Sequence, residues 1–104
     1  MVEEILTLAG IPNKETRFIY PPSETYAVWL DYVTRRGADN ALLIAEHSIT
    51  IEVYAKKIDK VAESNIEAVL AARAIPYEKS EHIWIESEQL FEVVYTFDYI
   101  EKRR

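Results

Sequence analysis

Polar and apolar residues alternate over much of the second half of this chain. In residues 82–100, which read HIWIESEQLFEVVYTFDYI, large apolar side chains fall on every second position: Phe91, Val93, Tyr95 and Phe97. A period of two is typical of a β-strand. The polar residues 86–89 separate this strand from a shorter one before it. Bulky residues also stand on the opposite face, as at Val94, so both faces of the strand are expected to be covered.

Two earlier runs predict a second pair of strands. Residues 26–33 (YAVWLDYV) alternate and again carry large side chains on both faces. Residues 42–45 return as a strand. In SITIEVYA (48–55) Ile49, Ile51 and Val53 are expected to share one face.

The segment TRRGADN (34–40) predicts the turn of a hairpin between these strands. Gly37 and Asn40 are its candidate positions for positive φ, and Asp39 is suited to cap its own backbone. Upstream, FIY (18–20) predicts a short extended segment that ends at two prolines.

Helical spacing occurs twice. Residues 2–9 predict a short N-terminal helix, which Gly10 stops. Asp59–Arg73 predicts a longer helix with Asp59 as its N-cap. Its expected buried stripe consists of Ile58, Val61, Ala62, Ile66, Val69 and Leu70. The fold class is therefore α+β, a mainly antiparallel sheet with both helices packed on one face, and the expected organisation is one domain, 1–104.

Composition narrows the function classes. The 104 residues include no cysteine, which excludes disulfides, thiolate metal sites and a cysteine nucleophile. The net charge of −6 disfavours binding of nucleic acid through its phosphates. No apolar run approaches the roughly 20 residues of a membrane span, and the N-terminus is acidic where a signal peptide is basic. We expect a protein made in the cytoplasm, with no membrane partner.

Candidate chemistry is sparse. His47 and His82 lack partners at the spacings of a zinc site, so we expect solvated or strand-end histidines. Glu86 and Glu88 could bind a cation or act as an acid and a base, but a charged turn between two strands is the commoner role. The terminal residues 102–104 form a basic tail of the kind that is usually solvated. We expect no catalytic residue, no cofactor and no tight metal site.

The aromatic residues are more informative. Two Trp and seven Tyr are many for this length, and four of these residues lie in predicted strands: Trp29, Tyr54, Trp84 and Tyr95. Two short helices can cover only one face of a sheet. The other face, or a strand edge, is therefore expected to contact another chain. The candidate interface residues are Arg35, Arg36, Asp39, Asn40, Tyr54, Trp84, Glu86 and Glu88.

Several motifs, taken in order, resemble a known family. ADN (38–40) is followed by IEVYA (51–55), where the family has a strand close to IELYT, and by a Lys-Asp segment. A helix with Glu63, Ile66, Glu67 and Leu70 matches the family's E..IE..L spacing, and residues 77–97 match its final strands. Over residues 21–97 the chain is similar to small siphophage and prophage tail-completion, or tail-terminator, proteins.

The resemblance implies a structural protein and no enzyme. Such proteins form a ring, typically a hexamer, which stops polymerisation of the major tail tube protein and meets the head–tail connector protein. Genomic DNA passes through the lumen without specific binding, and the ring belongs to the virion tail after assembly in the host cytoplasm. Two alternatives stay open: a small acidic protein-binding module that uses an exposed sheet edge, and an enzyme with carboxylate chemistry at Glu86 and Glu88.

Overall fold

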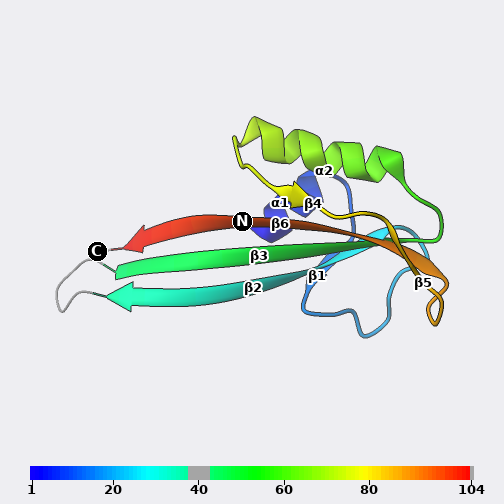
Figure 1. Cartoon of the computed structure of the whole chain (residues 1–104), viewed down its shortest axis with the longest axis horizontal. Helices are drawn as coiled ribbons and strands as arrows, with labels where there is room; N and C mark the ends of the chain where they lie inside the picture. Colours follow the sequence, from blue (N-terminus) through cyan, green and yellow to red (C-terminus); the bar gives the residue numbers. More distant parts are fainter. Residues whose placement is uncertain (38–42, 104) are drawn as a thin grey trace.

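The protein has an α+β fold built on a sheet with three long strands, and two helices pack against this sheet (Figure 1). The computed structural model describes residues 1–37 and 43–103. Its elements, in chain order, are α1 (Val2–Leu8), β1 (Asn13–Glu15), β2 (Tyr26–Gly37), β3 (Leu43–Ala55), α2 (Lys60–Ala72), β4 (Glu78–Lys79), β5 (Ile83–Ile85) and β6 (Leu90–Arg103). This confirms the predicted fold class.

The sheet is antiparallel apart from one edge. β3 lies in the middle and pairs with β2 on one side and β6 on the other. β1 pairs in parallel with the start of β2. The two short strands β4 and β5 follow one another along the outer side of β6.

The hairpin between β2 and β3 is confirmed, but its predicted boundaries are wrong. β2 continues to Gly37, four residues into the segment that was expected to turn, and residues 43–55 form one unbroken strand. Thr34, Arg35 and Arg36 are polar, so alternation ends there in the sequence, while the backbone pairing with β3 continues. The proposed turn residues Asp39 and Asn40 lie outside the described residues.

The predicted extended segment at 18–20 is also wrong. Those residues form no strand, and β1 lies before them at a polar stretch, Asn13–Glu15. Three polar residues give no periodic signal, and their extended conformation comes from pairing with β2. Thr16, with φ of 72°, then turns the chain away while its N–H donates to the carbonyl of Trp29 at 2.8 Å.

Both helices end as their sequences predict. At the end of α1, Gly10 adopts φ of 78°, which glycine tolerates without steric cost, and Ile11 N–H closes the helix on the Leu6 carbonyl. At the start of α2, the Asp59 carboxylate accepts a hydrogen bond from Ala62 N–H at 3.0 Å. The residue after the α2 C-cap, Ala74, takes φ of 55° in place of the usual glycine.

One core joins the two helices to a single face of the sheet. The predicted inward residues of β3 and β6 are buried there, among them Ile51 and Tyr95 at 0% exposure. From α2 the core takes Ala62, Ile66 and Leu70. The expected stripe was wrong at its N-terminal end, because Val61 is 72% exposed. At about 100° per residue, Val61 points roughly opposite to Leu70.

The Asp59 cap gives the first testable prediction. Asp59 also accepts a hydrogen bond from the Thr25 hydroxyl at 2.7 Å. The hydrogen bond from Ala62 N–H, and to a smaller extent the one from Thr25, lowers the pKa of the Asp59 carboxyl. Asp59→Ala should reduce the free energy of unfolding by about 1 kcal/mol at pH 7, measured by urea denaturation. Since the folded-state pKa is depressed, this contribution exists above the unfolded pKa of about 3.9 and is lost as the pH falls through the folded value.

A matched variant, Asp59→Ser, keeps a capping oxygen and should lose less than Asp59→Ala. A wild-type advantage that stays constant from pH 7 to pH 2 would contradict the role given to the carboxylate.

Candidate interaction surface

The half of the sheet that lies away from the helices forms a three-stranded arm. We define the distal arm as residues 30–37 of β2, 43–50 of β3 and 97–103 of β6. Figure 1 shows these strands continuing beyond both helices, and they account for the 50 Å long dimension of the molecule. At the base of the arm, Ile49 and Phe97 belong to the core that the helices cover, whereas neither helix covers its tip.

Both outer sides of the distal arm are open in the described part of the chain. β1 pairs with β2 only at residues 27–29, so nothing pairs beyond it along that edge. β4 pairs with β6 only as far as Thr96, so residues 97–103 are likewise unpaired on their outer side. Long exposed strand edges are templates for pairing with another chain.

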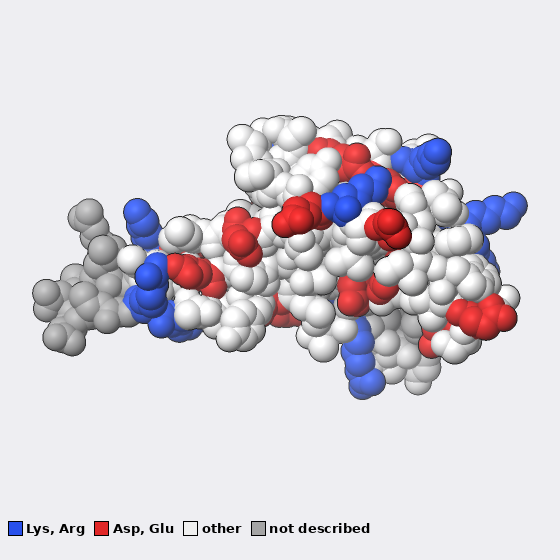
Figure 2. Space-filling view, in the orientation of Figure 1, with Lys and Arg blue, Asp and Glu red and all other residues white. Residues whose placement is uncertain are grey.

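The tip of the arm is basic, although the protein as a whole is acidic. Arg35, Arg36 and Lys102 are exposed there, and Figure 2 shows a group of basic side chains at the left-hand end of the molecule. Arg36 forms an ion pair with Glu46 across the β2–β3 pair. The predicted interface residues Arg35 and Arg36 therefore lie at the tip, as the hairpin prediction required.

A buried histidine ties the three strands of the arm together. His47 Nδ1 lies 2.8 Å and 3.0 Å from the Asp31 carboxylate oxygens, and its Nε2 lies 3.3 Å from Glu101. The ring stacks on Tyr99 with centroids 4.2 Å apart. Burial, and then the charges of Asp31 and Glu101, raise the pKa of Tyr99. The expectation of a solvated or strand-end His47 is wrong, since it is only 8% exposed.

The remaining described candidates lie at the opposite end of the sheet. Trp84 in β5 is 43% exposed; it donates from its indole N–H to the Glu86 carboxylate at 2.6 Å and packs on Phe91. Glu86 also faces the Gln89 amide at 3.4 Å. Glu86 and Glu88 thus lie in the β5–β6 turn, where the Glu86 carboxylate accepts hydrogen bonds from the neighbouring Trp84 and Gln89 side chains. A Glu86→Gln, Glu88→Gln variant would have to lose a measured activity to support an enzyme.

Tyr54 lies on the sheet face that the helices leave uncovered. Its ring stacks on Tyr26, with centroids 5.3 Å apart, and its hydroxyl donates to Glu52 at 3.0 Å. Burial raises the pKa of Tyr54, and the neighbouring Glu92 and Glu52 raise it further. Tyr54 is half-buried, and its stacking on Tyr26 stabilises the pairing of β3 with β2 without any contact to another chain.

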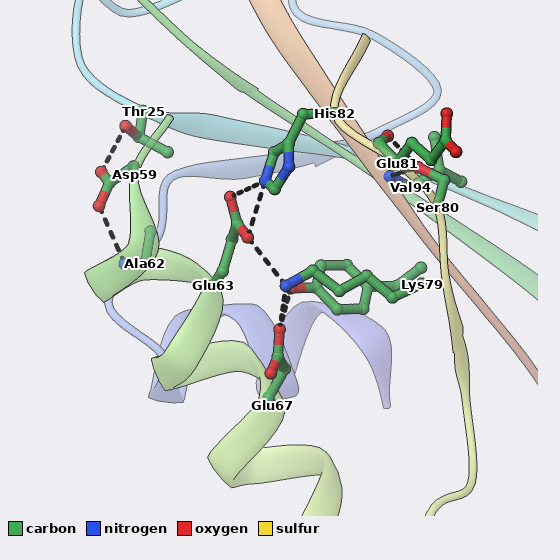
Figure 3. A network of polar contacts seen from close by, with 11 residues as sticks. Thr25, Asp59, Ala62, Glu63, Glu67, Lys79, Ser80, Glu81, His82 and Val94 are labelled. Carbon is green, nitrogen blue, oxygen red and sulfur yellow. Dashed lines mark hydrogen bonds and ion pairs between the residues drawn. The ribbon is translucent and has the colours of Figure 1, made fainter. Parts of the chain in front are cut away.

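A second buried charge cluster fastens the β4–β5 segment to α2 (Figure 3). Glu63, only 5% exposed, lies between Nε2 of His82 at 2.9 Å and Nζ of Lys79 at 2.9 Å. Lys79 also reaches Glu67, which accepts from the Tyr95 hydroxyl at 2.6 Å. Burial alone would lower the pKa of Lys79, but the two carboxylates outweigh it and raise that pKa. His82 contacts the Glu63 carboxylate, but it is exposed and directly precedes β5, which agrees with the expectation of a solvated or strand-end histidine.

Breaking this cluster should be costly. Lys79→Met removes the ammonium that pairs with the buried Glu63, and we expect the free energy of unfolding to fall by about 3 kcal/mol, measured by urea denaturation. Lys57→Met, which removes an exposed lysine, should change it by less than about 0.5 kcal/mol. Equal effects of the two variants would show that Glu63 does not depend on Lys79.

Within residues 1–37 and 43–103, no three His, Cys, Asp or Glu side chains are grouped so as to hold a metal ion. A groove between the end of α1 and the start of α2 is lined by both basic and acidic residues, among them Lys56, Lys57 and Asp59. No described helix is long and apolar enough to cross a membrane.

Those predicted interface residues that the structure describes therefore form two groups at opposite ends of the sheet. The structure brings Arg35 and Arg36 together at one end, and Trp84, Glu86, Glu88 and Tyr54 lie towards the other. Sequence reasoning missed the buried clusters around His47 and Glu63. The hairpin register would have placed Asp31 and His47 on one face, but that register depends on a turn whose position the sequence misjudges.

The fold resembles that of a virion component. The structure titled "Virion of native gene transfer agent (GTA) particle" contains a chain that superposes with a TM-score of 0.58 at 14% sequence identity. The match covers 90% of this chain and 81% of that chain. No family model and no curated protein matches the sequence. At this identity the likeness is one of fold.

Proposed function

We propose that this chain is a structural protein of a phage-like virion, and that it acts there as a tail-completion protein. The observation that carries the proposal is the fold likeness to a chain of a gene transfer agent particle over nine-tenths of the present chain. The order of motifs between Pro21 and Phe97, which resembles tail-terminator proteins, points to the same class from the sequence alone. The two lines of support are independent, since one rests on backbone geometry and the other on residue identity.

In this role, copies of the chain form a ring, six in number by the resemblance, at the end of the tail tube. One surface of the ring stops addition of the major tail tube protein and another receives the head–tail connector protein. Genomic DNA passes through the lumen. The net charge of −6 suits such a lumen, because like charge keeps the DNA from adhering. Assembly takes place in the host cytoplasm, and the product stays in the virion tail.

The test is to purify particles from a host that produces them and to measure the abundance of this chain by quantitative mass spectrometry. A tail-completion protein should be present at a few copies per particle, far below the tube protein. Deletion of its gene should give tails of irregular, excessive length, or heads without joined tails, in electron micrographs. Absence from particles, or normal particles after deletion, would refute the proposal.

A second candidate is favoured by one specific observation, the open outer edge of β2. An acidic binding module could add a strand of another protein there. Such a module would bind its partner outside any particle and would leave particle yield and tail length unchanged after deletion.

A further inference from the structure

The distal arm offers two open edges, and their backbone groups can be assigned residue by residue. On β2, Ala27 N–H donates to the Pro12 carbonyl and the Trp29 carbonyl accepts from Thr16, both towards β1. The odd-numbered residues of β2 therefore direct their N–H and C=O groups outward. Beyond β1 these are Asp31, Val33 and Arg35, which no described residue pairs with through the backbone.

The outward-facing backbone groups of β6 can be identified from its contacts with Ser80. Val94 N–H and its carbonyl both point outward, to the Ser80 hydroxyl at 2.9 Å and to Ser80 N–H at 2.8 Å. Even-numbered residues of β6 are thus outward-facing. Beyond β4 these are Asp98, Ile100 and Lys102. The described stretches of both edges contain no proline, the residue that commonly blocks such edges.

The two edges run in the same direction. β2 and β6 are each antiparallel to β3, so they are parallel to one another, on opposite sides of it. A contact between two like edges would leave the other edge of each copy open. A contact between β6 of one copy and β2 of the next satisfies both edges and repeats from copy to copy.

We infer that copies of this chain associate through their distal arms, with the outer edge of β6 in one copy pairing in parallel with the outer edge of β2 in the next. The inference deepens the proposed function, on which its ring geometry rests. Charge supports it: Arg35 and Glu101 lie at the same height, because both pair with Ala45, so an unshifted contact sets opposite charges side by side. Six arms would supply about eighteen strands, a number at which closed barrels enclose an aqueous channel.

Cysteine cross-linking tests the contact, because the chain has no cysteine of its own. Thr34 and Ile100 lie at the same height on the face away from the core, both opposite Glu46. Within one molecule β3 separates them by about 10 Å, two strand spacings, which is too far for a disulfide. Thr34→Cys is therefore combined in turn with Asp98→Cys, Ile100→Cys or Lys102→Cys. The three double variants cover the unshifted register between β2 and β6 of neighbouring copies and registers shifted by two residues in either direction.

Each full-length double variant is oxidised in a glutathione buffer at about 1 mM protein, and its fold is checked by circular dichroism. One of the three should give a ladder of disulfide-linked oligomers on a non-reducing gel, at least about tenfold above the collision control, Thr34→Cys with the 72% exposed Val61→Cys. Single-cysteine variants should stay monomeric, and an equimolar mixture of the two matching single variants should stop at dimers.

Two results would overturn the inference: dimers from a single-cysteine variant, which would mean that like edges pair, or no ladder above the collision control from any double variant. The result is separable from the proposed function. If the double variants form the oligomer ladder but the chain is absent from particles, only the proposed virion role is refuted. If the chain is present in particles but no double variant forms the ladder, only the edge pairing is refuted.

Discussion

Ile66→Asp should prevent this chain from folding. Ile66 is completely buried in the core between α2 and the sheet, so the substitution removes apolar contacts and places an unpaired carboxylate where water cannot reach. The buried Glu63 one turn earlier adds like-charge repulsion. We expect a loss of more than about 4 kcal/mol, a large part of the roughly 5–15 kcal/mol that stabilises a domain of this size. Circular dichroism at 25 °C should show little residual structure.

Val61→Asp is the matched control on the same helix. Val61 is 72% exposed, so the same change of residue type should alter the free energy of unfolding by no more than about 0.5 kcal/mol. Cooperative thermal unfolding of Ile66→Asp at the wild-type temperature would contradict the packing of α2. A large loss of unfolding free energy in Val61→Asp would show instead that Val61 is buried, as the sequence predicts.

Ile66 and Val61 show what helical periodicity can and cannot predict: it locates the helix, but it does not fix which apolar face is buried. The 3.6-residue pattern located α2 to within one residue at each end, because Asp59 and Pro76 mark its limits. The pattern could not choose between adjacent apolar stripes, since Ile58 and Val61 lengthen the stripe on the wrong side. A charged residue, Glu63, occupies the inward position instead, and it is tolerated only because Lys79 and His82 come from a distant segment.

The sheet shows the same division between local and long-range information. Alternation in residues 48–55 and 91–97 predicted which side chains are buried, because one face of each strand meets the core. Strand length was underestimated at Arg35 and Arg36, where pairing continues without an apolar pattern. The buried His47 needed the register of three strands, which follows from turn geometry and from burial that no single strand reveals.

Reversing the charge at the arm tip should disable particle assembly. In the variant Arg35→Glu, Arg36→Glu the tip becomes acidic, and at an unshifted arm contact the carboxylate introduced at position 35 would face Glu101 of the next copy. Like charges set side by side at an interface cost several kcal/mol, so docking should weaken by about 100-fold or more. In a host that carries the complete set of particle genes, we expect over-long tubes or tails that fail to join heads, counted in electron micrographs.

The fold should survive this change, because the Arg36–Glu46 ion pair is exposed and contributes less than about 1 kcal/mol. Lys56→Glu, Lys57→Glu is the control; it changes the net charge equally but lies beyond the other end of β3, away from the arm. If both variants assemble particles with tails of normal length, the arm tip is a solvated hairpin and takes no part in the interface. If both fail alike, net charge rather than the arm governs assembly. Failure of the arm variant alone would assign the contact to the tip, because the two proteins differ only in where the same charges stand.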